Sequence, residues 1–256
     1  MEFVKDELAV KLYPNRAEMG KGAAHDVAEC IRKCLKEKEE INMIFAAAPS
    51  QNDVLASLLE EPGIEWERIN AFHMDEYIGL PENAPQRFAE YLRGAIFSHK
   101  PFRSINYMNA AARNAEAECE RYTKLLKEHP VDIVCMGIGE NGHIAFNDPH
   151  VAEFKDKKWV KQVELDLVCR NQQVHDGCFE TLEDVPEYAL TLTIPALMAA
   201  DYHFCVVPAP SKAEAVKRTV CGDISEECPA TILRTKKGSV LYCDADSSRM
   251  LRETME

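Results

Sequence analysis

The sequence predicts an α/β fold with a mainly parallel sheet covered by helices on both faces. Short apolar runs alternate with longer amphipathic segments along the 256 residues, and these segments are long enough to form the crossover connections that parallel strands require. No repeat, low-complexity segment or Pro/Gly/Ser-rich linker divides the chain. We therefore expect a single domain over residues 1–256.

Taken in order, the apolar runs predict strands, and segments with apolar residues at helical spacing predict helices. Strands are expected at LAVKLYP (8–14), INMIFAAAPS (41–50), RINAFHM (68–74), FRSINYMN (102–109), VDIVCMGIG (131–139) and SVLYCDAD (239–246). Helices are expected over residues 16–38, 51–61, 85–97, 115–129 and 212–220. Residues 149–186 show no clear periodicity and are too many for a simple connection, so this stretch is a candidate lid.

The composition narrows the classes of function. A formal net charge of −13 disfavours nonspecific binding to nucleic acid or to an anionic membrane surface. The chain has no apolar run of about 18 residues, and MEFVKDELAV lacks the pattern of a signal peptide. We therefore expect a soluble, cytoplasmic protein; the sequence leaves open whether it forms a homo-oligomer.

The ten cysteines are scattered without a C-x-x-C pair, which argues against a zinc ribbon or a thioredoxin-type redox site. Cys30 and Cys34 stand four residues apart on an expected helix, but no second pair completes a metal site. We expect reduced thiols, most of them buried, and no metal.

Polar residues follow four of the expected apolar runs. They occur in AAAPSQN, HMDEY, GIGENGH and PAPSK. Ligands of open parallel sheets bind beyond the carboxyl ends of the strands. If these four turns lie on one edge of the sheet, they outline one pocket.

The turn GIGENG spells the G-x-G-x-x-G of a dinucleotide-binding loop. That fingerprint requires a helix to begin at the third glycine, here Gly142. The following residues, HIAFNDP, end in Pro149, which stops a helix within about two turns. We therefore expect a backbone cradle for another ligand and no nicotinamide cofactor.

His143 follows this cradle, and Asp148 comes five residues later. Histidine transfers protons near neutral pH, and a nearby carboxylate fixes its tautomer. A partly exposed loop histidine satisfies the same pattern. Asp75 and Glu76 of MDEY stand where a strand ends, and either a general base or a helix-capping acid fits that position.

Ser211 and Glu214 have the spacing of a capping box, with Lys212 in the first helical turn. A cation at that end opposes the helix dipole, which suggests an anion nearby, although exposed lysines need no such reason.

Two long motifs resemble those of the glucosamine-6-phosphate deaminase family, also called glucosamine-6-phosphate isomerase. NAFHMDEYIGLP resembles the family's M-D-E-Y-x-G-L-P, and GIGENGHIAFNDP resembles G-x-G-x-[ND]-G-H-I-x-F-N-E-P. VPEYALTLTIPALMAAD and SKAEAVKRTVCG resemble its later segments. The resemblance implies a Rossmann-like three-layer α/β/α fold and an enzyme that converts glucosamine 6-phosphate to fructose 6-phosphate and ammonia without a cofactor.

The resemblance also implies roles for individual residues. His143 would open the sugar ring, held by Asn141 and Asp148, and Asp75 would move the proton from C2 to C1. Lys212 would bind the phosphate. The backbone positions Gly137 and Ala145 would lie near the sugar.

Three departures concern the phosphate and the histidine. The family's glycine-rich loop P-T-G-G-[TS]-P is replaced by APSQNDVL, so Ser50, Gln51 and Asn52 are expected to supply side-chain donors. The family's lid arginine has no match in CRNQQVHDGCFETLEDVP: Arg170 is out of register, and Gln172 or His175 is a candidate replacement. Asp148 stands where glutamate is usual, so its contact to His143 is expected to shift or to pass through water.

Other functions remain open at this stage. They are isomerisation of another sugar phosphate such as galactosamine 6-phosphate, a 6-phosphogluconolactonase-like hydrolysis, and a sugar-phosphate sensor without activity. The lactonase reading gives no role to the base of MDEY, because ester hydrolysis has no C–H bond to break. A sensor has no need of Asp75 or His143, yet both are present.

Overall fold

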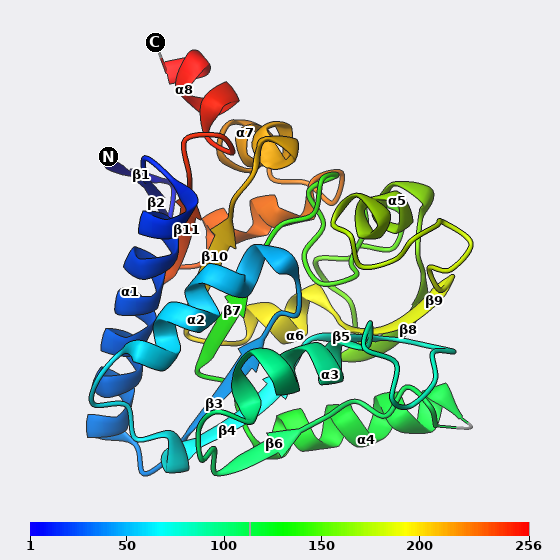
Figure 1. Cartoon of the computed structure of the whole chain (residues 1–256). Coiled ribbons are helices and arrows are strands. Elements are labelled where there is room, and N and C mark those ends of the chain that lie inside the picture. The colour runs from blue at the N-terminus through cyan, green and yellow to red at the C-terminus, as the bar shows by residue number, and fades with distance from the viewer. Residues whose placement is uncertain (113, 256) are drawn as a thin grey trace.

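The computed structural model describes residues 1–112 and 114–255 (Figure 1). The strands of its larger sheet are β1 (Glu2–Lys5), β2 (Leu8–Leu12), β3 (Ile41–Phe45), β4 (Ile69–His73), β6 (Ser104–Asn106), β7 (Ile133–Met136), β10 (Tyr202–Val207) and β11 (Ser239–Cys243). Their order in the sheet is β1-β2-β11-β10-β7-β3-β4-β6. All neighbours are parallel except β1 with β2, which confirms the expected mainly parallel sheet.

A second, antiparallel sheet was not expected from the sequence. It consists of β5 (Asp75–Tyr77), β9 (Tyr188–Leu192) and β8 (Val160–Glu164), in that order. Only Met74 separates β5 from β4. The small sheet therefore continues the chain directly from the carboxyl end of β4, the strand next to the edge strand β6.

The helices agree with the expected alternation. They are α1 (Arg16–Glu37), α2 (Asn52–Glu60), α3 (Phe88–Leu92), α4 (Ala115–Glu128), α5 (Leu167–His175), α6 (Ile194–Met198), α7 (Ala213–Cys221) and α8 (Arg249–Met255). Within the described residues, no helix has the length and apolar character needed to cross a membrane. The candidate lid, residues 149–186, contains β8 and α5 and is thus more regular than its sequence suggests.

Both faces of the large sheet are covered. Met43 and Phe45 of β3 pack into a hydrophobic cluster that includes residues of α1 and α2. Ile44, between them, packs into a second cluster that includes residues of α4, α6 and α7. Successive strand residues point to opposite faces, so a strand buried on both faces is apolar at nearly every position. This explains the uninterrupted apolar runs and gives the three-layer α/β/α arrangement.

The helix expected over residues 85–97 begins later, at Phe88. Arg87 is extended, and the carboxylate of Glu76 accepts hydrogen bonds from the backbone N–H groups of Phe88 and Ala89. An acid from β5 thus caps the first turn of α3. The chain then continues as a single π-helical turn, Arg93–Phe97.

Candidate active site

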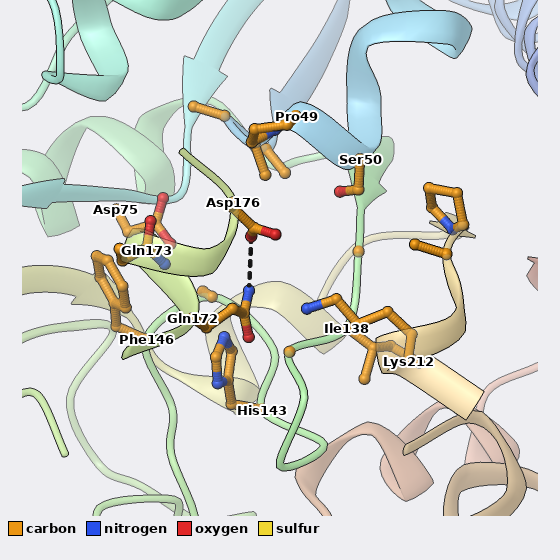
Figure 2. A pocket seen from close by; sticks show the side chains of 18 of the residues that line it. Pro49, Ser50, Asp75, Ile138, His143, Phe146, Gln172, Gln173, Asp176 and Lys212 are labelled. Carbon is orange, nitrogen blue, oxygen red and sulfur yellow. Dashed lines mark hydrogen bonds between the residues drawn. The ribbon is translucent and has the colours of Figure 1, made fainter. Parts of the chain in front are cut away.

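A cavity opens at the carboxyl ends of the parallel strands (Figure 2). Its lining includes residues 46–50 after β3, Met74 and Asp75 after β4, residues 137–139 after β7, and Pro208, Ala209, Ser211 and Lys212 after β10. The four polar turns therefore lie on one edge of the sheet and outline one pocket, as expected. Gln172, Gln173 and Asp176, from α5 and the residue that ends it, complete the wall.

The glycine turn after β7 is shaped around His143. A methyl group on Gly139 would lie 2.1 Å from Cε1 of His143, and Gly142 has a φ of +91°. The first position thus needs the absence of a side chain, and the second needs a backbone conformation that favours glycine. No helix begins at Gly142, so the motif lacks the feature that binds a pyrophosphate, as expected.

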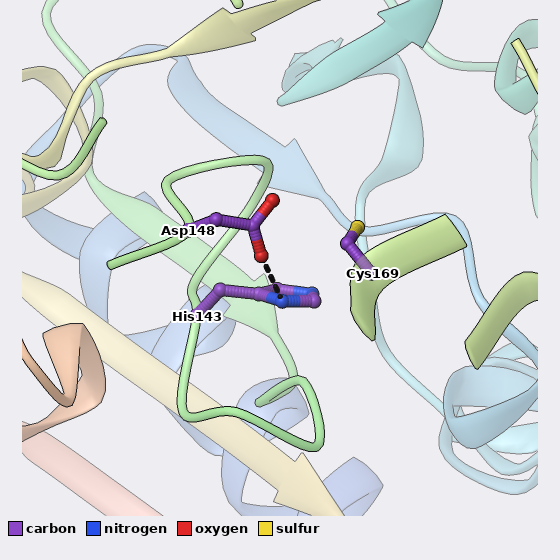
Figure 3. A group of neighbouring side chains, drawn as sticks. All are labelled: His143, Asp148 and Cys169. Atoms are coloured by element: carbon purple, nitrogen blue, oxygen red, sulfur yellow. Dashed lines mark ion pairs between the residues drawn. The ribbon is translucent and has the colours of Figure 1, made fainter. Parts of the chain in front are cut away.

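His143 is held by two acceptors on the same ring nitrogen, of which Figure 3 shows Asp148. Its Nδ1 lies 2.8 Å from Oδ1 of Asn141 and 2.9 Å from Oδ1 of Asp148. The amide nitrogen of Asn141 donates to that same Asp148 oxygen at 2.8 Å. Because both neighbours of Nδ1 are acceptors, Nδ1 carries the proton and Nε2 is left as the basic nitrogen.

Asp148 is fully buried, yet its shorter side chain reaches His143 directly. The contact therefore needs no bridging water, contrary to one of the expected alternatives. Burial raises the pKa of Asp148, but the charge of His143 and hydrogen bonds from His143 and Asn141 outweigh it, and the net pKa lies below the usual value. Asp148 is thus an ionised partner for the imidazole.

Cys169 of α5 lies beside this pair. The potential ligand atoms of His143, Asp148 and Cys169 all lie within 4.8 Å of one another (Figure 3). Burial and the nearby Asp148 and Asp166 carboxylates raise the pKa of the Cys169 thiol well above its ordinary value. We interpret the cluster as a positioned histidine, because Nδ1 of His143 is already engaged by Asn141 and Asp148.

Asp75 begins β5 and is only 7% exposed. Burial and the neighbouring charge of Glu76 raise its pKa well above the model-compound value of 3.8. The two acids of MDEY lie in different surroundings. Asp75 lines the cavity, whereas the carboxylate of Glu76 accepts hydrogen bonds from backbone N–H groups at the start of α3. Of the two, only Asp75 lines the cavity.

Lys212 is 5% exposed, and its Nζ has no hydrogen-bond partner within the described chain. Burial lowers its pKa, although the charges of Asp176 and Glu140 oppose that effect. Figure 2 shows Lys212 and Asp75 on opposite sides of the cavity. A buried, unpartnered ammonium that faces a cavity is suited to an anionic ligand.

The expected capping box at Ser211 is wrong. Pro210–Lys212 forms a 3₁₀ turn whose N-terminal flanking residue is Ala209, and α7 follows it directly, so Ser211 lies inside the turn. Ala209 has φ 84° and ψ 148°, a region populated almost only by glycine. The strained residue and Ser211 both line the cavity.

The three residues expected to supply donors in place of the glycine-rich loop, Ser50, Gln51 and Asn52, do not all lie at the cavity. Ser50 lines the cavity, but Gln51 and Asn52 do not. The amide nitrogen of Gln51 donates to Oγ of Ser50 at 3.1 Å and to the carbonyl of Val206 at 3.2 Å. In this structure the side-chain donors of Gln51 are used within the protein and hold Ser50 in place.

Gly137 and Ala145 both line the cavity, as expected. A methyl group on Gly137 would lie 3.1 Å from Nε2 of Gln51 and 3.3 Å from Oγ of Ser50. Ala145 has a φ of 48°, a left-handed conformation that is uncommon outside glycine. The backbone thus comes close to the cavity at both positions.

Of the two candidate replacements for the lid arginine, Gln172 lines the cavity and His175 does not; Arg170, which is out of register in the sequence, does not line it either. Arg170 donates to the carbonyls of Leu182 and Val185, and the side chain of His175 is 66% exposed; neither lines the cavity. Gln172 lines the cavity, but both ends of its side-chain amide are engaged within the protein. Its Oε1 accepts from the backbone N–H of Glu140 at 2.8 Å, and its Nε2 donates to Oδ2 of Asp176 at 3.2 Å.

Sequence analysis missed three polar residues of the wall: Arg16, Gln173 and Asp176. Arg16 is the first residue of α1. A cation at a helix N-terminus opposes the helix dipole. Arg16 therefore carries the same sequence signal as Lys212, a cation in the first turn of an expected helix. No comparable signal marks Gln173 or Asp176.

Comparison with known proteins gives three findings. Residues 14–242 match the family described as glucosamine-6-phosphate isomerases/6-phosphogluconolactonase. The chain is 32% identical over 212 residues to the glucosamine-6-phosphate deaminase of Listeria monocytogenes serotype 4a, covering 83% of this chain and 88% of that protein. It is 31% identical over 248 residues to the enzyme of the same name from Bacillus cereus strain G9842, covering 97% and 90%.

Solved structures give the same picture of the fold. A monomeric glucosamine-6-phosphate deaminase superposes with a TM-score of 0.85 and 28% identity, covering 94% of this chain and 99% of that one. A 6-phosphogluconolactonase from Thermotoga maritima has a TM-score of 0.76 at 19% identity, covering 93% and 99%. The second likeness concerns the fold alone.

Proposed function

The chain belongs to the glucosamine-6-phosphate isomerase/6-phosphogluconolactonase family, and we propose that it converts glucosamine 6-phosphate and water to fructose 6-phosphate and ammonia. One observation carries the proposal: a buried carboxyl, Asp75, and an oriented imidazole, His143, face the same cavity. An aldose-to-ketose conversion with loss of ammonia requires two kinds of proton transfer, one at oxygen and one at carbon.

The imidazole is suited to the first transfer, which opens the pyranose ring. With its proton on Nδ1, His143 accepts the proton of the anomeric hydroxyl at Nε2 and delivers it to the ring oxygen. The ring C–O bond breaks, and C1 becomes an aldehyde. Asp148 and Asn141 keep the imidazole in this tautomer and stabilise its transient positive charge.

The carboxylate is suited to the second transfer. The C2–H bond next to the aldehyde is acidified but remains a weak acid, so its removal needs a base placed directly on it. Asp75 takes the C2 proton, giving an enolamine with its negative charge on O1, and returns it to C1; a proton then passes from the nitrogen to O1, giving an imine at C2 and a hydroxyl at C1. Water then adds to the imine carbon and ammonia leaves, so that the atoms balance as fructose 6-phosphate and ammonia.

A phosphate bound far from C2 would hold the sugar so that the base meets the right carbon. We assign this role to Lys212, with Ser50 as a neutral donor, and we place the sugar against Gly137 and Ala145. This assignment rests on the unpartnered, buried Nζ of Lys212 across the cavity from Asp75 (Figure 2).

The experiment is to measure ammonia and ketose released from glucosamine 6-phosphate, galactosamine 6-phosphate and both unphosphorylated amino sugars. Asp75→Asn is expected to lower turnover by about 10²- to 10⁴-fold, the usual contribution of a general base. Asp246→Asn, a change at an exposed aspartate outside the cavity, serves as the control. Turnover unaffected by Asp75→Asn would refute the mechanism, and equal turnover of unphosphorylated sugar would refute the phosphate role of Lys212.

The same assay includes 6-phosphogluconolactone as a substrate. Hydrolysis of that ester in preference to release of ammonia would favour the lactonase alternative, and no turnover of any substrate, with binding retained, would favour a sensor. The C4 epimers glucosamine 6-phosphate and galactosamine 6-phosphate are compared by their kcat/KM.

A further inference from the structure

Arg16 lies at the cavity although it comes from the far N-terminal part of the chain. Its Nε donates to the carboxylate of Asp53, and its Nη2 donates to the carbonyl of Pro49. Both partners belong to the turn and helix that carry Ser50. The guanidinium is therefore fixed beside the segment that replaces the glycine-rich phosphate loop.

Close packing of two helices puts Arg16 there. A methyl group on Gly20 of α1 would lie 2.6 Å from Cβ of Asp53 in α2, so the N-terminal turns of these helices are in direct contact. A guanidinium has five N–H donors. Asp53 and Pro49 use Nε and Nη2, and Nη1 has no hydrogen-bond partner among residues 1–112 and 114–255.

The charges in the cavity wall favour a second cation for a phosphate. Lys212 supplies one positive charge, but Asp176 lines the same cavity and its charge acts on Lys212. A phosphate monoester carries a charge of about −1.5 to −2 at neutral pH. Asp176 offsets part of the positive charge of Lys212, so Lys212 alone does not balance the phosphate, and the family's lid arginine has no match in this chain.

We propose that Arg16 is the second phosphate-binding cation of this site. It acts with Lys212 and Ser50 and takes the place of the lid arginine; this inference rests on the proposed function. Asp53 and the Pro49 carbonyl hold the guanidinium, which leaves the Nη1 donors for the phosphate oxygens. Because Arg16 belongs to α1 rather than to the stretch 149–186, its contact to the phosphate does not depend on movement of that stretch.

The test compares Arg16→Gln with the wild type in two ways. Calorimetric titration with inorganic phosphate measures anion binding without any reaction, and steady-state kinetics give kcat and KM for glucosamine 6-phosphate and glucosamine. Arg16→Gln is expected to weaken phosphate binding and to raise the KM for glucosamine 6-phosphate, each by about ten- to a hundredfold, the usual worth of a charge-assisted contact. Activity on unphosphorylated glucosamine is expected to stay the same.

Three further variants separate anion binding from a structural role. Asp53→Asn keeps an acceptor for Nε and removes a negative charge, so phosphate binding should be unchanged or tighter. Arg16→Lys should restore part of the affinity. Arg32→Gln, which removes another α1 arginine that pairs with Glu29, should have no effect.

Two results would overturn the inference. The first is phosphate binding by Arg16→Gln within twofold of the wild type. The second is that Arg16→Gln and Asp53→Asn weaken phosphate binding equally, which would mean that Arg16 acts only through its ion pair. The proposed function fails separately, if the wild type releases no ammonia from glucosamine 6-phosphate. In that case the titration with inorganic phosphate still decides the role of Arg16.

Discussion

Nδ1 of His143 lies 2.9 Å from Oδ1 of Asp148, with no bridging atom between them. The four residues between them, 144–147, fold back on themselves, with an isolated bridge between Ile144 and Asn147. Asn147 stabilises this loop by donating to the carbonyls of Ile144 and Leu192. The fold of the loop thus compensates for the shorter side chain of an aspartate.

Asp148→Asn is expected to lower kcat for ammonia release by about ten- to a hundredfold. The amide keeps the size but removes the negative charge that stabilises the protonated imidazole, while Asn141 still orients the ring. The measurement is kcat from ammonia release, with Asp246→Asn as the control. A kcat within twofold of the wild type would mean that Asp148 has no part in proton transfer.

Gly139→Ala is expected to abolish most activity while leaving the fold intact. The added methyl group would lie 2.1 Å from the His143 ring, so the imidazole must leave its position. Gly94→Ala is the matched control, because a methyl group there meets nothing within 4 Å. Activity and circular dichroism are compared for both variants; full activity of Gly139→Ala would show that the position of the ring is not critical.

Asp75→Asn is expected to stabilise the protein above about pH 4. The pKa of Asp75 is raised in the folded state, so between its ordinary pKa and its folded pKa the folded chain binds more protons than the unfolded chain. The free energy of unfolding therefore falls as pH rises through that window, and asparagine avoids this loss.

Thermal unfolding at several pH values checks the sign. The Tm difference between Asp75→Asn and the wild type should grow with pH and level off above the folded pKa of Asp75. A variant that is less stable at every pH, by a constant amount, would contradict the burial argument. The same pKa predicts that kcat/KM of the wild type falls as pH drops through it, because only the carboxylate is a base.

Ala209→Gly is expected to raise the free energy of unfolding by about 1 kcal/mol. Ala209 occupies a backbone region that costs an alanine of the order of 1–3 kcal/mol, and the greater freedom of glycine in the unfolded chain offsets part of the gain. Ala56→Gly, at an exposed position within α2, should instead lose about 1 kcal/mol. Urea unfolding measures both; a loss at position 209 equal to that at position 56 would refute the strain.

The alternation of apolar and amphipathic segments was sufficient to predict most strands of the large sheet and five of the helices, because periodicity is a local property of the chain. The small sheet escaped prediction: β5 has only three residues, and β8 lies in the irregular stretch 149–186. The start of α3 also depends on Glu76, twelve residues away from Phe88.

The sequence by itself determined the family motifs, the glycine turn with its histidine, and the candidate base Asp75. Only the tertiary structure decided which polar side chains reach the cavity. The amide of Gln51 donates to the carbonyl of Val206, 155 residues distant, and Arg16 reaches the cavity because α1 packs closely on α2. Motifs and periodicity record neighbours along the chain, whereas hydrogen bonds between distant segments form only when those segments pack together.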